Sequence, residues 1–211
     1  MAAMDECRSS PYFRGEMTAI PEQNRLSSQT FTAWADAFTP AELDRIIAYG
    51  DQLQQDKANL LSTPEGATAE QIRITQTARI QQTGETQWLH DRLQGIVQGL
   101  NAQSYQYELS GFAEPFQYTV YRDQDGGHYD WHVDHGPLAV QRKLSISVQL
   151  SDGAGYDGCD LQFMAGSQLQ LAPRDRGAVI AFPSYVLHRV TPVTRGVRKA
   201  LVVWVTGPNF R

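Results

Sequence analysis

Apolar residues recur at helical spacing in two stretches of the first half of the chain. The residues Thr39-Pro40-Ala41-Glu42 have the form of a capping box with proline at the first helical position. They predict a helix that begins there and ends near Leu53. A second amphipathic helix is predicted over residues 86–102, because its apolar residues fall on one side: Trp88, Leu89, Leu93, Ile96, Val97 and Leu100.

The chain between these helices is polar over residues 56–70, where Ser62-Thr63-Pro64-Glu65-Gly66 indicates a turn, and a short strand is predicted over 72–80. From about residue 113 the pattern changes to short strand-like runs separated by glycine-containing turns. The predicted strands are residues 116–122, 128–133, 143–150, 160–163, 178–182, 186–190 and 199–205. Helices followed by about seven short strands indicate an α+β fold with an all-β barrel or sandwich at its centre.

A single domain is the simplest organisation, because the sequence contains no internal repeat and no low-complexity linker. Residues 1–28 mix charge, proline and serine without a period, and we assign them to an N-terminal arm. We expect residues 29–211 to form the domain, with helical support over 29–112 and the β-rich core over 113–211.

The composition of the 211 residues is that of an ordinary soluble globular protein, with 41% hydrophobic and 19% charged residues. A formal net charge of −5 argues against a nucleic-acid partner, which usually requires a basic face. No apolar run approaches the roughly 20 residues of a membrane helix, and the N-terminus lacks the apolar segment of a secretory signal. Cys7 and Cys159 are too few for a disulfide framework, so we expect free thiols in a reducing cytoplasm.

The segment from Tyr121 to His135 contains three histidines and several acids. Residues two apart in a strand point to the same side, so His132 and Asp134 can direct an imidazole and a carboxylate to one point. Two histidines and one carboxylate form the facial triad of non-haem iron oxygenases, which leaves positions open for a co-substrate and oxygen. His188 is the only histidine after His135 and is the candidate third ligand. Residues 128–130 are a second His-x-Asp with the same parity, and periodicity does not choose between the two pairs.

Arg198 directly precedes the predicted strand 199–205, and Trp204 lies within it. The two residues are six positions apart, so in an extended chain both side chains can point to the interior. An arginine inside a barrel requires an anion, because an unpaired buried charge is very costly. A dicarboxylate co-substrate would supply one, and the planar guanidinium binds a carboxylate through two hydrogen bonds. On the strand 143–150 the polar residues Ser145, Ser147 and Gln149 share one face, which either meets solvent or lines a pocket.

These residues resemble the signature of the prolyl 4-hydroxylase-like dioxygenases. Tyr121, followed by Gly127-His-Tyr129-Asp-Trp-His132-Val-Asp134, is similar to the Tyr…Gly-x-Tyr-x-x-His-x-Asp motif of that family. The segments that most resemble its bacterial PKHD-type branch are Arg142–Asp152, Tyr156–Leu161 and Phe182–Gly196. The resemblance covers roughly residues 113–211, and Cys159 stands where a second glycine is expected in Tyr-x-Gly-Gly-x-Leu.

The resemblance implies a double-stranded β-helix (a jelly-roll) with supporting N-terminal α-helices. It favours His132 and Asp134 over the pair at 128–130, because Tyr129 matches the motif tyrosine. By motif position, Arg198 would hold the far carboxylate of 2-oxoglutarate. Tyr121 and Gln149 would assist it, and Trp204 would pack beside the site. We expect His90, His128 and His135 to be structural.

The implied reaction is hydroxylation of an aliphatic C–H bond by iron(II), 2-oxoglutarate and O₂, with ascorbate as reductant and succinate and CO₂ as products. A prolyl residue, or another amino-acid or peptide substrate, is expected. Asp134 favours hydroxylation over halogenation, because related halogenases lack this carboxylate. Two alternatives are a nucleic-acid demethylase, which tends to carry a second arginine where Trp204 stands, and a non-oxygenase cupin-like metal-binding protein, which would need no Arg198. A homodimer is compatible with the sequence.

Overall fold

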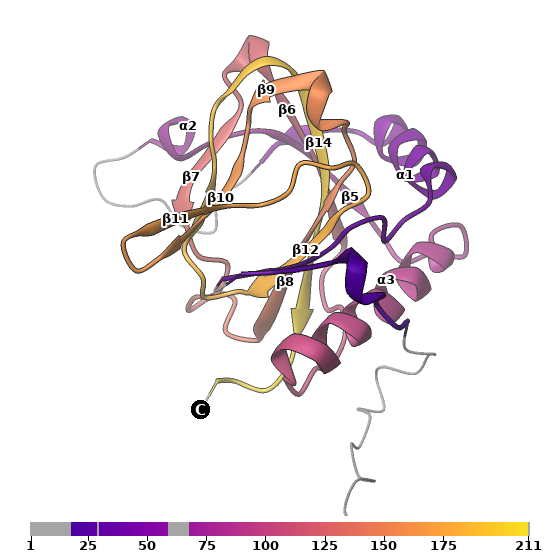
Figure 1. Cartoon of the computed structure of the whole chain (residues 1–211). Helices are drawn as coiled ribbons and strands as arrows, with labels where there is room; N and C mark the ends of the chain where they lie inside the picture. The colour runs from indigo at the N-terminus through magenta and orange to yellow at the C-terminus, as the bar shows by residue number, and fades with distance from the viewer. Residues whose placement is uncertain (1–17, 29, 59–67, 211) are drawn as a thin grey trace, which may run out of the picture.

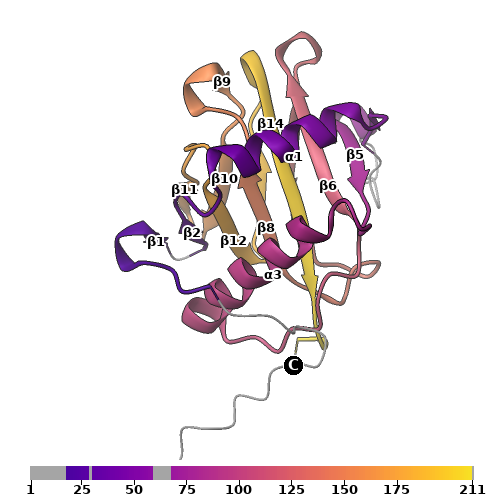
Figure 2. The same cartoon turned by 90° about the vertical axis from the view of Figure 1, so that its right-hand side faces the viewer.

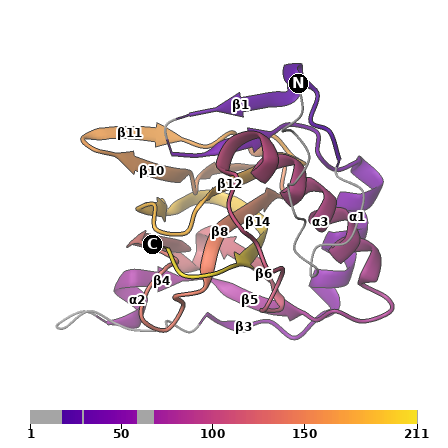
Figure 3. The ribbon, with the colours of Figure 1, turned by 90° about the horizontal axis from the view of Figure 1, so that it is seen from below.

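Two antiparallel β-sheets face each other and enclose the space in which the candidate site residues meet (Figures 1 and 3). The structure, a computed structural model, describes residues 18–28, 30–58 and 68–210, and the turn predicted at 62–66 lies outside these residues. The larger sheet contains, in spatial order, β1 (Arg25–Ser27), β2 (Thr32–Trp34), β12 (Val179–Pro183), β8 (Arg142–Gln149), β14 (Val193–Thr206), β6 (Phe116–Arg122), β5 (Gln76–Ile80) and β3 (Asp56–Lys57), with β9 (Tyr156–Gly158) paired to β14. The smaller sheet contains β11 (Gln168–Leu171), β10 (Leu161–Ala165), β13 (His188–Val190), β7 (His128–His132) and β4 (Arg73–Ile74). The predicted α+β class with a jelly-roll core is confirmed.

Two helices, α1 (Pro40–Gln52) and α3 (Gln87–Leu100), lie across the outer face of the larger sheet (Figure 2). The predicted capping box is present in α1, where Thr39 Oγ1 accepts from the Glu42 amide and the Glu42 carboxylate accepts from the Thr39 amide. The apolar side of α3 is buried as its spacing predicted. A Cβ at Gly50 of α1 would meet the Tyr118 ring at 2.6 Å, so only glycine permits this close packing on β6. Within the described residues, no helix has the length and apolar character needed to cross a membrane.

Short elements connect the sheets and helices. They are η1 (Glu22–Asn24), α2 (Ala69–Ile72), the π-helix η2 (Asn101–Tyr105) that continues α3, η3 (Asp123–Asp125) and η4 (Gly153–Gly155). The strand predicted over 72–80 is divided between the two sheets, because β4 pairs with β7 while β5 pairs with β6. Thr75 lies at the division and donates a hydrogen bond to the Val120 carbonyl at 3.0 Å. This crossing closes one side of the barrel.

Several strands differ from the sequence prediction. Strand β14 extends over Val193–Thr206 rather than 199–205, because it pairs successively with β9, β6 and β8 and bends at Gly196, where φ is +78°. Strand β13 begins at His188 rather than 186, and β11 was not predicted. Strand β1 lies inside the segment assigned to the N-terminal arm, so the larger sheet begins before residue 29. Partner strands, not an apolar period of their own, hold these short segments in place.

The core consists of two buried layers. One lies between the larger sheet and the helices and includes Leu93, Ile96 and Tyr118. The other lies on the inner side of the barrel and includes Phe31, Phe163 and Phe182, which contact one another through ring pairs centred on Phe163 at 4.9 Å. The aromatic layer supports the strands that carry the candidate site.

Truncation of Leu93, which is 0% exposed under the larger sheet, is expected to destabilise the domain. Leu93→Ala should lower the free energy of unfolding by about 2–5 kcal/mol, since it removes buried methyl groups and leaves a cavity. Urea unfolding followed by circular dichroism measures this change. The matched control is Leu171→Ala on β11, where leucine is 58% exposed. That change should stay within about 0.5 kcal/mol, and equal losses in both variants would contradict the described packing.

Candidate metal centre

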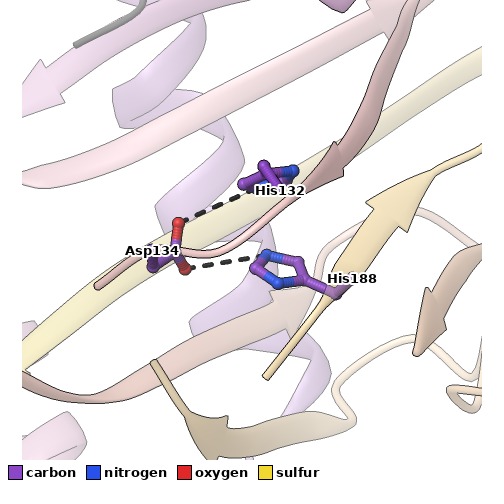
Figure 4. Close-up of side chains that lie close together, drawn as sticks. All are labelled: His132, Asp134 and His188. Atoms are coloured by element: carbon purple, nitrogen blue, oxygen red, sulfur yellow. Dashed lines mark ion pairs between the residues drawn. The ribbon is translucent and has the colours of Figure 1, made fainter. Parts of the chain in front are cut away.

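Three side chains, two at strand ends and one in the segment after β7 (His128–His132), meet at one point (Figure 4). His132 is the last residue of β7, Asp134 follows it by two residues, and His188 is the first residue of β13. His132 and His188 are direct cross-strand partners in the smaller sheet. One potential ligand atom from each residue lies within 4.8 Å of the others. The structure therefore brings together the two histidines and the carboxylate that the sequence singled out.

The Asp134 carboxylate lies between the two imidazoles, as the dashed lines in Figure 4 mark. Its Oδ1 is 3.8 Å from His132 Nε2, and its Oδ2 is 3.7 Å from His188 Nε2. Ser145 Oγ donates to Asp134 Oδ2 at 2.6 Å, and the Asp134 amide donates to the Ser184 carbonyl at 2.9 Å. One bond holds the side chain of Asp134 and the other holds its backbone. The sequence had not indicated that Ser145 and Ser184 orient this carboxylate.

Backbone carbonyls orient both histidines. His132 Nδ1 lies 2.7 Å from the Asp130 carbonyl oxygen, and His188 Nδ1 lies 2.9 Å from the Val186 carbonyl oxygen. A carbonyl only accepts, so in each ring Nδ1 carries the proton and Nε2 presents its lone pair to the cluster. Metal-bound histidines are held in this way by their other ring nitrogen. Two imidazole nitrogens and one carboxylate with these orientations fit a divalent transition metal.

The protonation states agree with a ligand role. Burial, followed by the neighbouring His188, lowers the pKa of His132 to about 3, so this imidazole is neutral at pH 7. Burial alone would raise the pKa of Asp134, but His188, His132 and the Ser145 hydrogen bond outweigh it, and the net pKa lies below the usual value. The cluster therefore offers one neutral imidazole and one carboxylate with no proton to displace from either.

The cluster opens onto a cavity of about 390 Å³ whose wall also includes Arg198 and Tyr121. Arg198 is 2% exposed, and both its Nε and Nη2 donate to Gln149 Oε1, at 3.2 and 2.9 Å. No carboxylate among the described residues pairs with it. Gln149 Nε2 donates to the Pro173 carbonyl at 3.0 Å, which fixes the orientation of the amide. A buried guanidinium with no acidic partner in a cavity wall fits an anionic ligand.

The polar face of β8 points inward, which decides between the two alternatives left open by its alternating pattern. Ser145 contacts Asp134, Gln149 contacts Arg198, and Ser147 lines the cavity. Trp204 lies opposite Ser145 on β14, also lines the cavity, and stacks under the Arg142 guanidinium at 3.8 Å.

The second His-x-Asp pair lies away from the cluster. His128 places Nδ1 2.9 Å from the Gly126 carbonyl and Nε2 3.2 Å from the Gln71 carbonyl, and Asp130 is exposed. A β-bulge in β7 separates the two pairs. His132 lies opposite His188 and Tyr129 lies opposite Val190, so β7 advances three residues where β13 advances two. The bulge interrupts the alternation of side chains, so His128 and His132 point to different faces of β7. Uninterrupted alternation, which the sequence analysis assumed, had placed both pairs on the same face.

The remaining histidines have structural contacts. His90 Nδ1 lies 3.1 Å from the Thr86 carbonyl, and the ring stacks on Phe116 at 4.0 Å. His135 packs edge-on against Phe210 at 5.5 Å. Cys159, the departure from the expected glycine, is buried with φ of +54°, so this cysteine adopts the left-handed conformation that glycine favours. The substitution keeps the backbone of the turn.

Comparisons with known proteins agree with this geometry. Residues 116–206 match the sequence model of the 2OG-Fe(II) oxygenase superfamily. A PKHD-type hydroxylase of Teredinibacter turnerae is 36% identical over 97 residues, which are 43% of this chain and 42% of the relative. A PKHD-type hydroxylase of Hyphomonas neptunium is 28% identical over 145 residues, 66% of this chain and 63% of the relative. The first of these alignments spans less than half of the relative's length, and neither reaches two thirds.

Solved structures share the fold. A prolyl-4-hydroxylase of Pseudomonas putida superposes with a TM-score of 0.66 at 23% identity, covering 85% of this chain and 94% of that one. A prolyl hydroxylase of Trichoplax adhaerens, in complex with a peptide of the hypoxia-inducible factor, gives 0.68 at 14% identity, covering 85% and 84%. The matched segment contains all three residues of the cluster and Arg198. Residues 116–206 of this chain therefore resemble the 2OG-Fe(II) oxygenase superfamily in sequence, and the chain shares the fold of these prolyl hydroxylases.

Proposed function

We propose that this chain is an iron(II)- and 2-oxoglutarate-dependent hydroxylase. The observation that carries the proposal is the presence, in one cavity, of the His132, Asp134 and His188 cluster and of the buried Arg198, which pairs with no carboxylate of the described residues. A metal-binding module that takes no dicarboxylate would have no use for this guanidinium, whose burial is costly without an anion.

His132, Asp134 and His188 would hold the iron through two Nε2 atoms and one carboxylate. When bound, iron and 2-oxoglutarate supply the oxygen chemistry: one atom of O₂ enters a substrate C–H bond as a hydroxyl, and the other enters succinate as CO₂ leaves. The protein contributes orientation, since the Asp130 and Val186 carbonyls fix the rings and Ser145 fixes the carboxylate. We infer that ascorbate keeps the iron reduced between turnovers.

Arg198 would bind the carboxylate of 2-oxoglutarate remote from the iron. Gln149 accepts from the guanidinium through Oε1 and thereby limits its rotation before the co-substrate arrives. Tyr121, 3% exposed, lies with its ring 5.6 Å from the Arg198 guanidinium and would close this end of the cavity. Trp204 would form the wall between the co-substrate and the substrate, because it lines the cavity and carries Arg142 on its ring.

A prolyl residue, or another amino-acid or peptide group, is the proposed substrate. The printed names of the structural neighbours from Pseudomonas putida and Trichoplax adhaerens support prolyl hydroxylation. The test is a peptide panel incubated with iron(II), 2-oxoglutarate and ascorbate, analysed by mass spectrometry for the gain of one oxygen atom. Succinate release without hydroxyproline in any peptide would remove proline as the substrate.

His132→Ala should abolish metal-dependent succinate formation, with a loss of at least about 100-fold, because it removes one of three ligands. The matched control is His128→Ala, four residues earlier on the same strand and outside the cluster. The control should retain succinate formation and cobalt(II) binding, measured by absorption spectroscopy, while His132→Ala loses both. Equal losses in the two variants would contradict the assignment of the ligand.

Arg198→Gln should raise the KM for 2-oxoglutarate by roughly 10- to 100-fold, because charge-assisted hydrogen bonds to a carboxylate are worth about 1.5–3 kcal/mol. Succinate formation at increasing 2-oxoglutarate measures KM and kcat separately. Arg195→Gln is the control, since Arg195 lies on the same strand but pairs with Asp157 at the surface. A wild-type protein that neither binds nor consumes 2-oxoglutarate when loaded with iron would refute the proposed function.

A further inference from the structure

The cavity has a second basic region that the metal cluster and Arg198 leave unexplained. Its wall includes three more arginines, Arg73, Arg79 and Arg142, and only one further acid, Glu114. Arg142 pairs with that acid through both oxygens, because its Nε and Nη2 donate to the two carboxylate oxygens of Glu114, each at 2.6 Å. Among the described residues, no carboxylate remains for Arg73 or Arg79. Within the described part of the chain, Arg73 and Arg79 therefore face the cavity without an ion-pair partner of their own.

Arg73 is connected to the candidate ligand His132 through the ring of Tyr129. Its guanidinium is 4.5 Å above the Tyr129 ring, and that ring stacks on His132 with centroids 3.4 Å apart. Its Nη2 donates to Gln117 Oε1 at 2.8 Å, while its Nε is buried and has no hydrogen-bond partner. A buried N–H without an acceptor is costly, and a bound anion would supply the acceptor.

Arg79 comes to the same wall from the other sheet. Arg73 stands on β4, opposite Tyr129 of the smaller sheet, whereas Arg79 stands on β5, opposite Gln117 of the larger sheet. The crossing of the chain between the sheets at Thr75 thus brings both arginines to the cavity. The pKa of Arg79 lies below its usual value, first because of burial and also because of the positive charges of Arg73 and Arg142. The carboxylate of Glu114 acts in the opposite direction. Mutual repulsion of this kind is relieved when an anion binds among the cations.

We propose that Arg73 and Arg79 bind a carboxylate of the primary substrate and hold the neighbouring C–H bond toward the iron. This inference rests on the proposed function and specifies its substrate as an anionic one. The carboxylate has two possible sources: the α-carboxylate of a free amino acid or chain end, or an acidic side chain beside the target residue in a peptide. Both have the chemistry that paired guanidinium groups recognise.

The experiment is isothermal titration calorimetry on the full chain loaded with zinc(II), which occupies the cluster without turnover, and saturated with 2-oxoglutarate. One probe pair is N-acetyl-L-proline and its neutral amide. The other pair is the N-acetylated, C-amidated dipeptides Glu-Pro and Gln-Pro. At least one acid should bind at least about 10-fold more tightly than its amide. Binding of acetylproline alone would assign the α-carboxylate, and binding of Glu-Pro alone would assign an acidic side chain.

The variants Arg73→Gln and Arg79→Gln should remove this preference for acid over amide, and Arg73→Lys should restore part of it. Arg45→Gln is the control, because Arg45 also stacks on an aromatic ring, Trp88 at 4.2 Å, but lies outside the cavity. Affinity for 2-oxoglutarate should stay within about twofold of wild type in Arg73→Gln, whereas it falls in Arg198→Gln.

Three results would overturn the inference. These are equal affinity for acids and amides, no binding of either acid up to about 10 mM, and a loss of 2-oxoglutarate affinity in Arg73→Gln as large as in Arg198→Gln. The last would assign Arg73 to the co-substrate. Failure of the proposed function is separate, since it appears as no 2-oxoglutarate binding by the wild type. The comparison of acids with amides, repeated without 2-oxoglutarate, still decides the role of the arginines.

Discussion

The register between β7 and β13 is the constraint on which the site depends. It sets His132 opposite His188, and the bulge in β7 turns Tyr129 and His132 toward the same cavity. The Ser184 carbonyl accepts from the amides of both Asp134 and His135, each at 2.9 Å, so the segment after β7 is bonded to the segment before β13. A slip of one residue would turn the imidazoles apart, because alternate side chains in a strand point to opposite faces.

Buried charged side chains from both sheets and their connections line the cavity. Asp134 lies between two imidazoles and accepts a hydrogen bond from Ser145, whereas Arg198 donates to the neutral oxygen of Gln149 and has no carboxylate partner among the described residues. Glu114 forms a bidentate ion pair with Arg142. Buried charges that serve stability alone are expected to be paired, because an unpaired buried charge costs about several kcal/mol of folding free energy. The buried Arg198 guanidinium, which has no carboxylate partner in the described part of the chain, therefore indicates where a ligand completes the structure.

The two helices contribute to this arrangement from outside. They cover the face of the larger sheet opposite the cavity and bury its apolar side chains, so the inner face is free to carry polar ones (Figure 2). Strand β8 illustrates the division: Leu144, Ile146 and Val148 are buried, and Ser145, Ser147 and Gln149 on the alternate positions serve the site. A jelly-roll with one covered sheet can thus hold a polar interior without losing its hydrophobic core.

The sequence by itself determined the elements with strong local signals and the chemistry of the candidate site. The capping box at Thr39 and the apolar side of α3 follow from neighbouring residues alone. Residues 132, 134, 188 and 198 were singled out by their chemistry and by a family resemblance, since periodicity left the pair at 128–130 as an alternative. The tertiary structure decided the rest. It placed β1, β2 and β11, extended β14, and separated His132 from His128 through a bulge. It also brought Arg73 and Arg79, which lie on either side of the chain crossing at Thr75, to the wall of the cavity that holds the cluster. The physical reason is that periodicity reports which face a residue occupies, whereas the pairing partner, the bulge and the crossing depend on segments far away in the chain.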